Sequence, residues 1–239
     1  MKPYHQVPIQ DCGEPLVAIP LEEFAAVIPH PYAMLGAPYG DRSPYCVRSG
    51  VLVALREAQQ ILQQSCPGWR IQLFDAYRPV AVQQFMVEYT FADLVRQQGL
   101  TDAALSATDR DRLLAQVFEF WAPPNLDPAA PPPHSTGAAV DVTLVDASGA
   151  VIDMGSPIDE VSVRSHPNHF ATAPDPTAQG YHHHRQCLRH CFVAAGFHQH
   201  PKEWWHFSLG DQLWAWQHQQ HTGKRAIARY GRVEPCPQA

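Results

Sequence analysis

Hydrophobic residues recur at helical spacing in two long segments of the chain. Between residues 51 and 64 and between residues 80 and 98, apolar side chains fall three or four positions apart, which places them on one face of a helix. Two shorter helices are also expected. One covers residues 113–121 after a capped start formed by Thr108 and Asp111, and the other covers residues 185–195 and stops at Gly196.

Short runs of apolar and β-branched residues predict strands near residues 70–75, 139–145 and 204–209. Together these elements predict an α+β fold, in which a small antiparallel sheet has helices on one side. No repeat, Gly/Ser tract or charge block divides the 239 residues, so a single domain over 1–239 is expected. Six prolines between Pro123 and Pro133 predict an ordered surface loop at about 122–133.

Composition narrows the classes of partner but not the oligomeric state. The formal net charge of −6 argues against a nucleic acid or an anionic membrane, because such partners favour a basic face. No apolar run has the length of a secretion signal or a membrane span, which predicts a cytoplasmic protein. The six cysteines form no CxxC pair, and their spacing leaves disulfides open; Cys187 and Cys191 are expected to pack in the core.

Four residues with metal or acid–base chemistry stand in two short segments. His134 and Asp141 lie in HSTGAAVDVTL, and Glu203 and His206 lie in KEWWHFSL. Two histidines and an aspartate would fill three of zinc's four positions and leave one for water, which is the arrangement of a hydrolase. Glu203 is not needed as a ligand, so it would be free to take a proton from that water.

The local sequence constrains how these residues meet. Gly137 permits the chain to reverse between His134 and Asp141, and Asp141 interrupts a strand that is otherwise apolar. An unpaired buried carboxylate is costly, so Asp141 needs a metal, a cation or several hydrogen-bond donors. Positions i and i+3 of a regular strand face opposite ways, so Glu203 is expected just before the strand, after Pro201, where the backbone need not be regular.

Each half of this pattern also has a plain structural interpretation. The chain has fourteen histidines, so one histidine near an acid shows little. Asp141 could cap a turn or pair with an arginine, and Glu203 could be a solvated charge beside Lys202. The two segments occur together and in this order along the chain, and this combination favours the metal site over the separate structural interpretations.

Four segments resemble a known family. HSTGAAVDVTL and EWWHF are similar to the two zinc motifs of D-alanyl-D-alanine dipeptidases of the vancomycin-resistance type, which belong to a wider group of zinc D,D-peptidases that share a fold with lysostaphin and the hedgehog signalling domain. FDAYRP at 74–79 resembles the arginine motif of the family, and DMGSPID at 153–159 resembles the segment after its first zinc motif. The four matches span about residues 70–210.

The resemblance implies a function and a role for each site residue. One zinc ion per chain would be held by His134, Asp141 and His206. Glu203 would be the catalytic base, Arg78 the electrophile that stabilises the transition state, and Asp159 the group that holds the free amino end of the substrate. The implied reaction is hydrolysis of the D-Ala-D-Ala dipeptide, a step in peptidoglycan metabolism.

Arg78 and Asp159 have structural alternatives. Arg78 could be a surface arginine paired with Asp75. Asp159 could form an Asx turn or a helix cap after Pro157.

The chain departs from the family at the first zinc motif. The family usually has serines just before the first histidine, where this chain has Pro132 and Pro133, and an arginine two residues after it, where this chain has Thr136. The serine positions lie against the substrate in the family. Their replacement removes hydroxyl donors and stiffens the approach to His134, which bears on substrate preference more than on zinc binding.

Three alternative functions or sites stay open at this stage. A zinc D,D-carboxypeptidase or wall endopeptidase would share the zinc motifs but predicts an open cleft without a group for the amino end. A non-catalytic zinc-stabilised binding module would need neither Glu203 nor Arg78. The histidine-rich segment from His166 to His184 could supply a second metal site, or its histidines could be solvated loop residues, with His182–His184 leading into a helix.

Overall fold

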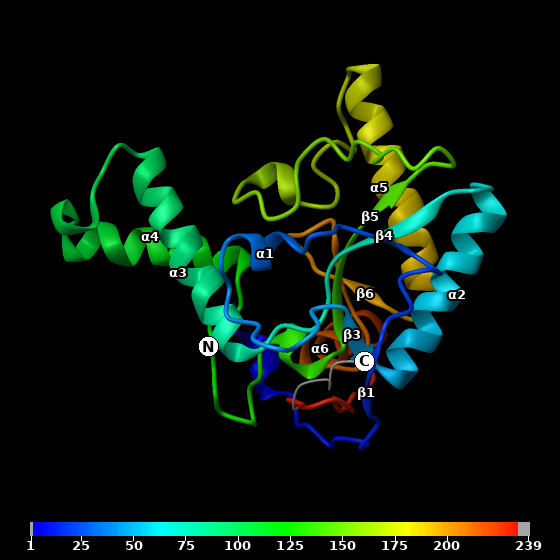
Figure 1. Ribbon diagram of the computed structural model, residues 1–239, viewed down its shortest axis with the longest axis horizontal. Helices are drawn as coiled ribbons and strands as arrows, with labels where there is room; N and C mark the ends of the chain where they lie inside the picture. The colour runs from blue at the N-terminus through cyan, green and yellow to red at the C-terminus, as the bar shows by residue number, and fades with distance from the viewer. Residues whose placement is uncertain (1, 234–239) are drawn as a thin grey trace.

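The computed structural model describes residues 2–233 and has the expected α+β architecture (Figure 1). A five-stranded sheet runs in the order β2 (Ala25–Ala26), β4 (Arg70–Asp75), β5 (Ala139–Val145), β7 (His206–Ser208) and β6 (His198–Gln199). The pairs β4–β5, β5–β7 and β6–β7 are antiparallel, as expected, whereas the two-residue edge strand β2 runs parallel to β4. Strands β1 (Leu16–Ala18) and β3 (Cys46–Arg48) form a separate antiparallel pair.

Six α-helices and four 3-10 turns accompany the strands in the described part of the chain. The helices are α1 (Pro31–Met34), α2 (Ser49–Ser65), α3 (Val80–Gln97), α4 (Ala107–Phe120), α5 (Pro176–Ala194) and α6 (Gln212–Thr222). The turns are η1 (Pro3–Gln6), η2 (Asp102–Ala104), η3 (Pro133–Thr136) and η4 (Val163–Ser165). Helices α2 and α3 lie within two residues of the limits that the apolar stripes predicted.

The starts expected for α4 and α5 are wrong. Helix α4 begins at Ala107, because Ser106 is the cap and accepts a hydrogen bond from the backbone of Asp109 at 3.1 Å. Helix α5 begins at Pro176, after the cap Asp175, so His182–His184 lie within this helix rather than before it. The first turns of both helices are mostly polar and exposed, so no apolar stripe marks them.

The main core fills the space between the sheet and the helices α2 and α5. The side chains of Leu55, Ile71, Leu144, Phe192 and Phe207 are fully buried there. Cys191 belongs to this core and Cys187 packs against it, as expected, while Cys236 lies outside the described residues. Hydrophobic stabilisation grows with the apolar area that folding removes from water, so this core is the main source of it.

A second apolar cluster joins α3 and α4 to the segment around α1. It contains Tyr32, Tyr39 and Trp121 as well as the inner faces of both helices. Figure 1 shows α2 and α5 on one side of the sheet and α3 and α4 projecting from the other. The expectation that all helices lie on one side is therefore wrong, and Arg78, just before α3, stands where the two clusters meet.

The loop that carries the first motif is fixed by a buried arginine. Arg48 donates from its backbone N–H to Gly137 O at 2.8 Å and from Nε to Thr136 O at 2.8 Å. Gly137 has the left-handed φ of 70° that the chain reversal requires. Residues 122–129 are half-buried or exposed, but Pro132 and Pro133 are buried, so the proline-rich segment is a surface loop only in its first part.

No helix within residues 2–233 combines the length and the apolar character that crossing a membrane requires.

Gly137→Ala should lower the free energy of unfolding more than Gly223→Ala. The two glycines have almost the same φ, 70° and 69°, so an alanine at either site adopts a left-handed conformation that costs about 1–2 kcal/mol. Only at Gly137 would the new Cβ meet another side chain, Leu16 Cδ1 at 2.4 Å, which adds about 1–3 kcal/mol of overpacking. Urea unfolding of both variants measures the difference, and equal losses would contradict tight packing at this loop.

Candidate metal centre and active site

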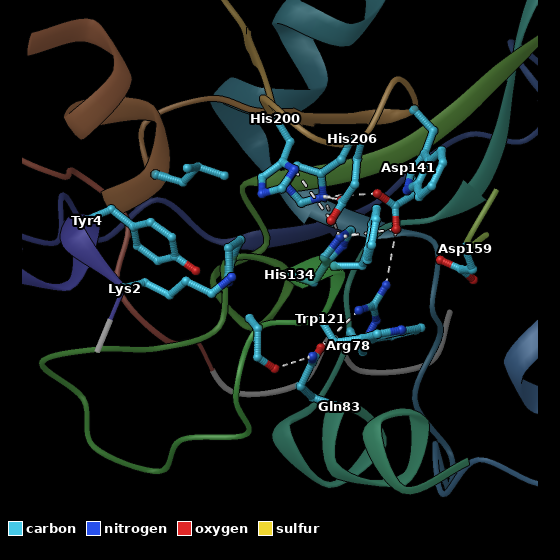
Figure 2. Close-up of a pocket in the computed structure, with 16 residues that line it drawn as sticks. Lys2, Tyr4, Arg78, Gln83, Trp121, His134, Asp141, Asp159, His200 and His206 are labelled. Carbon is cyan, nitrogen blue, oxygen red and sulfur yellow. Dashed lines mark hydrogen bonds and ion pairs between the residues drawn. The ribbon is translucent and has the colours of Figure 1, made fainter. Parts of the chain in front are cut away.

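The residues His134, Asp141 and His206 converge on one point (Figure 2). His134 comes from η3, while Asp141 and His206 are register partners on β5 and β7. Nε2 of His134 lies 3.2 Å from Nδ1 of His206, and Oδ1 of Asp141 lies 3.0 Å from the same Nδ1. One ligand atom from each residue lies within 4.8 Å of the others, and all three side chains are buried.

The outer nitrogens of the two histidines are held by neighbouring oxygens. Nδ1 of His134 contacts Ala76 O at 2.7 Å, and Nε2 of His206 contacts Ser208 Oγ at 3.2 Å. A carbonyl oxygen only accepts, so Nδ1 of His134 donates to Ala76 and the lone pair of Nε2 faces the centre. The Ser208 hydroxyl can accept from Nε2 of His206, which would leave the lone pair of Nδ1 toward the centre in the same way. Two imidazoles and one carboxylate fit zinc and leave a fourth position open.

Asp141 is ionised at the centre of this group. Burial by itself would raise the pKa of Asp141, but His134 and His206 lower that pKa to well below its ordinary value. The carboxylate also accepts a hydrogen bond from Nη2 of Arg78 at 3.1 Å. Asp141 is therefore surrounded by partners, as the cost of a buried charge predicted.

Glu203 lies in irregular backbone just before β7, the position expected for it. Its side chain is buried, with Oε2 3.7 Å from Nδ1 of His206 and Oε1 3.4 Å from Nδ1 of His200. Among residues 2–233, Oε1 has no hydrogen-bond partner. Burial, together with the charges of Asp141 and Asp159, raises the pKa of Glu203 well above its ordinary value. A carboxylate of raised pKa beside the metal position suits the transfer of a proton.

Arg78 faces the same centre from the other side. It is 4% exposed, so it is not a surface residue, although it does pair with Asp75: Nε donates to Asp75 Oδ2 at 2.9 Å. Nη1 donates to Gln83 Oε1 at 2.9 Å, and the rings of Tyr32 and Trp121 flank the guanidinium at 5.0 and 4.9 Å. The guanidinium plane is thereby fixed in the pocket.

Asp75, which holds Arg78, belongs to a buried network of its own. Its Oδ1 lies 3.0 Å from Nε2 of His30 and accepts a hydrogen bond from the hydroxyl of Tyr39 at 3.1 Å. Burial opposes ionisation of Asp75, but Arg78 and His30 lower its pKa to about 2. The negative charge that orients Arg78 is therefore stable.

Asp159 lies half-buried in a turn with a φ of 66° and lines the same pocket. Tyr32 donates to its Oδ2 at 2.8 Å. Burial, with the charge of Asp141 nearby, raises the pKa of Asp159 to about 7. Asp159 does not cap the helical turn that follows, η4, because Ser162 is that cap.

The pocket around these groups has a volume of about 40 Å³. Several lining residues were not found by sequence analysis: Lys2, Tyr4, Gln83, Phe120, Trp121, His200 and Leu213. They come from segments far apart in the chain, and their own neighbourhoods carry no motif.

The histidine-rich segment does not form a second metal group. Among the residues that the structure describes, only His134, Asp141 and His206 bring three ligand atoms together. His166 and His169 lie in the loop before α5, and His182–His184 lie on the helix.

Comparison with known proteins gives matches over most of the chain. The peptidase M15 family model, described as D-ala-D-ala dipeptidase, matches residues 25–224. A D-alanyl-D-alanine dipeptidase from Synechocystis sp. is 51% identical over 241 residues, which covers 98% of each chain. One from Enterococcus faecalis is 29% identical over 165 residues, covering 68% of this chain and 72% of the relative. A solved vancomycin-resistance D,D-pentapeptidase, VanY, in complex with Zn(II), has a TM-score of 0.39 at 17% identity, covering 75% of this chain and 81% of that chain.

His206→Ala should weaken zinc binding by more than about 100-fold, because loss of a partner one shell further out already costs 10- to 100-fold. His169→Ala, which removes an imidazole from the histidine-rich loop, should leave the zinc content at one ion per chain. Metal analysis of both variants after dialysis against dilute zinc measures the content. An unchanged content in the His206 variant would contradict the assigned centre.

Proposed function

This chain belongs to the D-alanyl-D-alanine dipeptidase family of zinc metallopeptidases, and from this premise we propose that it hydrolyses D-Ala-D-Ala with Glu203 as general base and Arg78 as the oxyanion donor. The chain spans almost the whole length of the Synechocystis relative, which supports carrying the dipeptidase activity to it. Membership in a family of peptidases disfavours a non-catalytic zinc module, which would require neither Glu203 nor Arg78.

The observation that carries the choice of a dipeptide is the carboxylate of Asp159 in the wall of the pocket. A carboxypeptidase or endopeptidase that acts on longer peptides predicts a cleft without a group for the amino end. A carboxylate at this position can accept hydrogen bonds from the ammonium group of a short substrate. A longer peptide has an amide there, which offers no positive charge.

Glu203 supports proton transfer through its position and its environment. Zinc, when held by His134, Asp141 and His206, would polarise the scissile carbonyl and make water acidic near neutral pH. Glu203 accepts the proton of the attacking water, because its carboxylate lies beside the metal-binding group, with Oε2 3.7 Å from Nδ1 of His206 and Oε1 without a hydrogen-bond partner among residues 2–233. It then returns that proton to the nitrogen of the leaving amine.

Arg78 supports stabilisation of the developing oxyanion. Its guanidinium is held by Asp75, Gln83 and Asp141, and also by the hydroxyl of Tyr32, so the N–H group of Nη1 that these contacts leave over keeps its direction while the reaction proceeds. Fixed donors of this kind contribute about 3–4 kcal/mol to the transition state. Asp159 would anchor the amino end while Arg78 and Glu203 act on the peptide bond.

Glu203→Gln should abolish nearly all hydrolysis of D-Ala-D-Ala, by a factor of about 10²–10⁴, because glutamine cannot accept the proton. Its zinc content should stay at one ion per chain, since Glu203 is not a ligand. Glu119→Gln, which removes an exposed carboxylate that pairs with Lys202, is the matched control and should keep normal turnover. Release of D-alanine, followed with a coupled oxidase assay, measures the rates; normal turnover in the Glu203 variant would overturn its role.

Asp159→Asn should raise KM for D-Ala-D-Ala about 10- to 100-fold, the range for loss of a hydrogen bond between charged groups. Wild-type protein should cleave D-Ala-D-Ala but neither its N-acetyl derivative nor a pentapeptide that ends in D-Ala-D-Ala. Asp153→Asn changes an exposed acid of the same segment and should leave KM unaltered. Release of D-alanine only from the pentapeptide would favour the carboxypeptidase instead.

A further inference from the structure

The pocket has charges of opposite sign on its two sides. Figure 2 shows Lys2 and Asp159 on opposite sides of His134, with the metal-binding group between them. A free dipeptide is a zwitterion whose ammonium and carboxylate flank the scissile bond. The pocket therefore matches both the order and the sign of the charges on such a ligand.

Lys2 has donors to spare for a ligand. Its half-buried ammonium donates one hydrogen bond, to Phe118 O at 2.6 Å, and no carboxylate of the described residues lies within 4.0 Å of Nζ. An ammonium has three donors, so two are left over. The other strong cation of the pocket, Arg78, is already paired with Asp75 and Asp141. Lys2 thus has no close ion pair among the described residues, although the charges of Glu203 and Glu119 act on it from further away.

The position of Lys2 is set by tertiary contacts. The turn that follows it, η1, packs on α6, where Gln212 donates from Nε2 to Val7 O at 2.7 Å and to Ala129 O at 3.0 Å. Tyr4 is buried and its hydroxyl points into the pocket beside Lys2 (Figure 2). Further along, Ile9 pairs with Ala228. These contacts hold the segment at the pocket, which Lys2 and Tyr4 line.

We propose that Lys2 binds the terminal carboxylate of the dipeptide and thereby selects substrates whose second residue ends the peptide. This inference rests on the proposed dipeptidase function and adds the residue that recognises the carboxyl end. Pro133, which lines the pocket next to His134, has no N–H and offers no competing donor there. Lys2 would bind the carboxylate end of the ligand and Asp159 its ammonium end. Only a ligand whose charged ends match the separation of these two side chains is then bound at both ends.

The test compares Lys2→Met, Lys2→Arg and wild type on D-Ala-D-Ala and on D-alanyl-D-alaninamide, which lacks the carboxylate. Wild type should favour the acid. Lys2→Met should raise KM for the acid about 10- to 100-fold with kcat little changed, because a contact that is equal in the ground and transition states acts on KM. The amide should be cleaved by this variant as by wild type, and Lys2→Arg should retain most of the preference for the acid.

Lys202→Met is the matched control, because Lys202 lies near the pocket but pairs with Glu119 at 2.9 Å and does not line the pocket. It should keep the wild-type ratio of acid to amide. If Lys2→Met slows the acid and the amide equally, Lys2 only closes the pocket and the inference is overturned. An unchanged ratio in Lys2→Met overturns it as well. If wild type cleaves neither compound, the proposed function itself fails, an outcome distinct from cleavage without a preference for the acid.

Discussion

The burial of the Asp141 carboxylate in the central strand is the constraint on which the site depends. Its neighbours Val140 and Val142 are fully buried, so water cannot solvate the charge. The free energy cost of such a charge is large unless partners surround it. Three residues provide those partners: Arg78 from the loop between β4 and α3, His134 from η3 and His206 from β7. The need to compensate the charge of Asp141 thus brings the two metal-binding histidines and Arg78 together in the pocket.

Outer contacts keep this group in place. Asp75 holds Arg78 and is itself held by His30 and Tyr39. The direction of the Arg78 guanidinium is therefore fixed by a chain of hydrogen bonds and not by the rotamer preference of the side chain. Arg48 fixes the loop of His134 in the same way, through Thr136 and Gly137. Such layers reduce the freedom of the catalytic groups before a substrate arrives, which is how a preorganised site stabilises a transition state.

The walls of the pocket decide which ligand the site can take. Zinc-binding residues and an adjacent carboxylate suit the hydrolysis of many amides, but Asp159 and Lys2, which line the same pocket, favour a short zwitterion. One of those walls comes from the second apolar cluster, through Trp121, and another comes from the segment of Lys2 and Tyr4. Substrate choice therefore belongs to parts of the chain that lie outside the zinc motifs.

The sequence by itself determined the elements with a periodic apolar face and the residues of the motifs. Helices α2 and α3, strands β4 and β5 and the irregular backbone at Glu203 could be predicted, because the causes are local: spacing, β-branching and a charge that must leave a regular strand. The starts of α4 and α5 carry no apolar periodicity and are marked locally only by their caps, Ser106 and Asp175. The parallel edge strand β2 carries no apolar periodicity either, and only the folded chain reveals it. Only the folded chain likewise shows that Lys2, Tyr32 and Trp121 contribute to the site, because they reach it from positions far away in the sequence. Which polar groups become neighbours is decided by tertiary packing, since a hydrogen bond or an ion pair across a pocket has no signature in the local sequence.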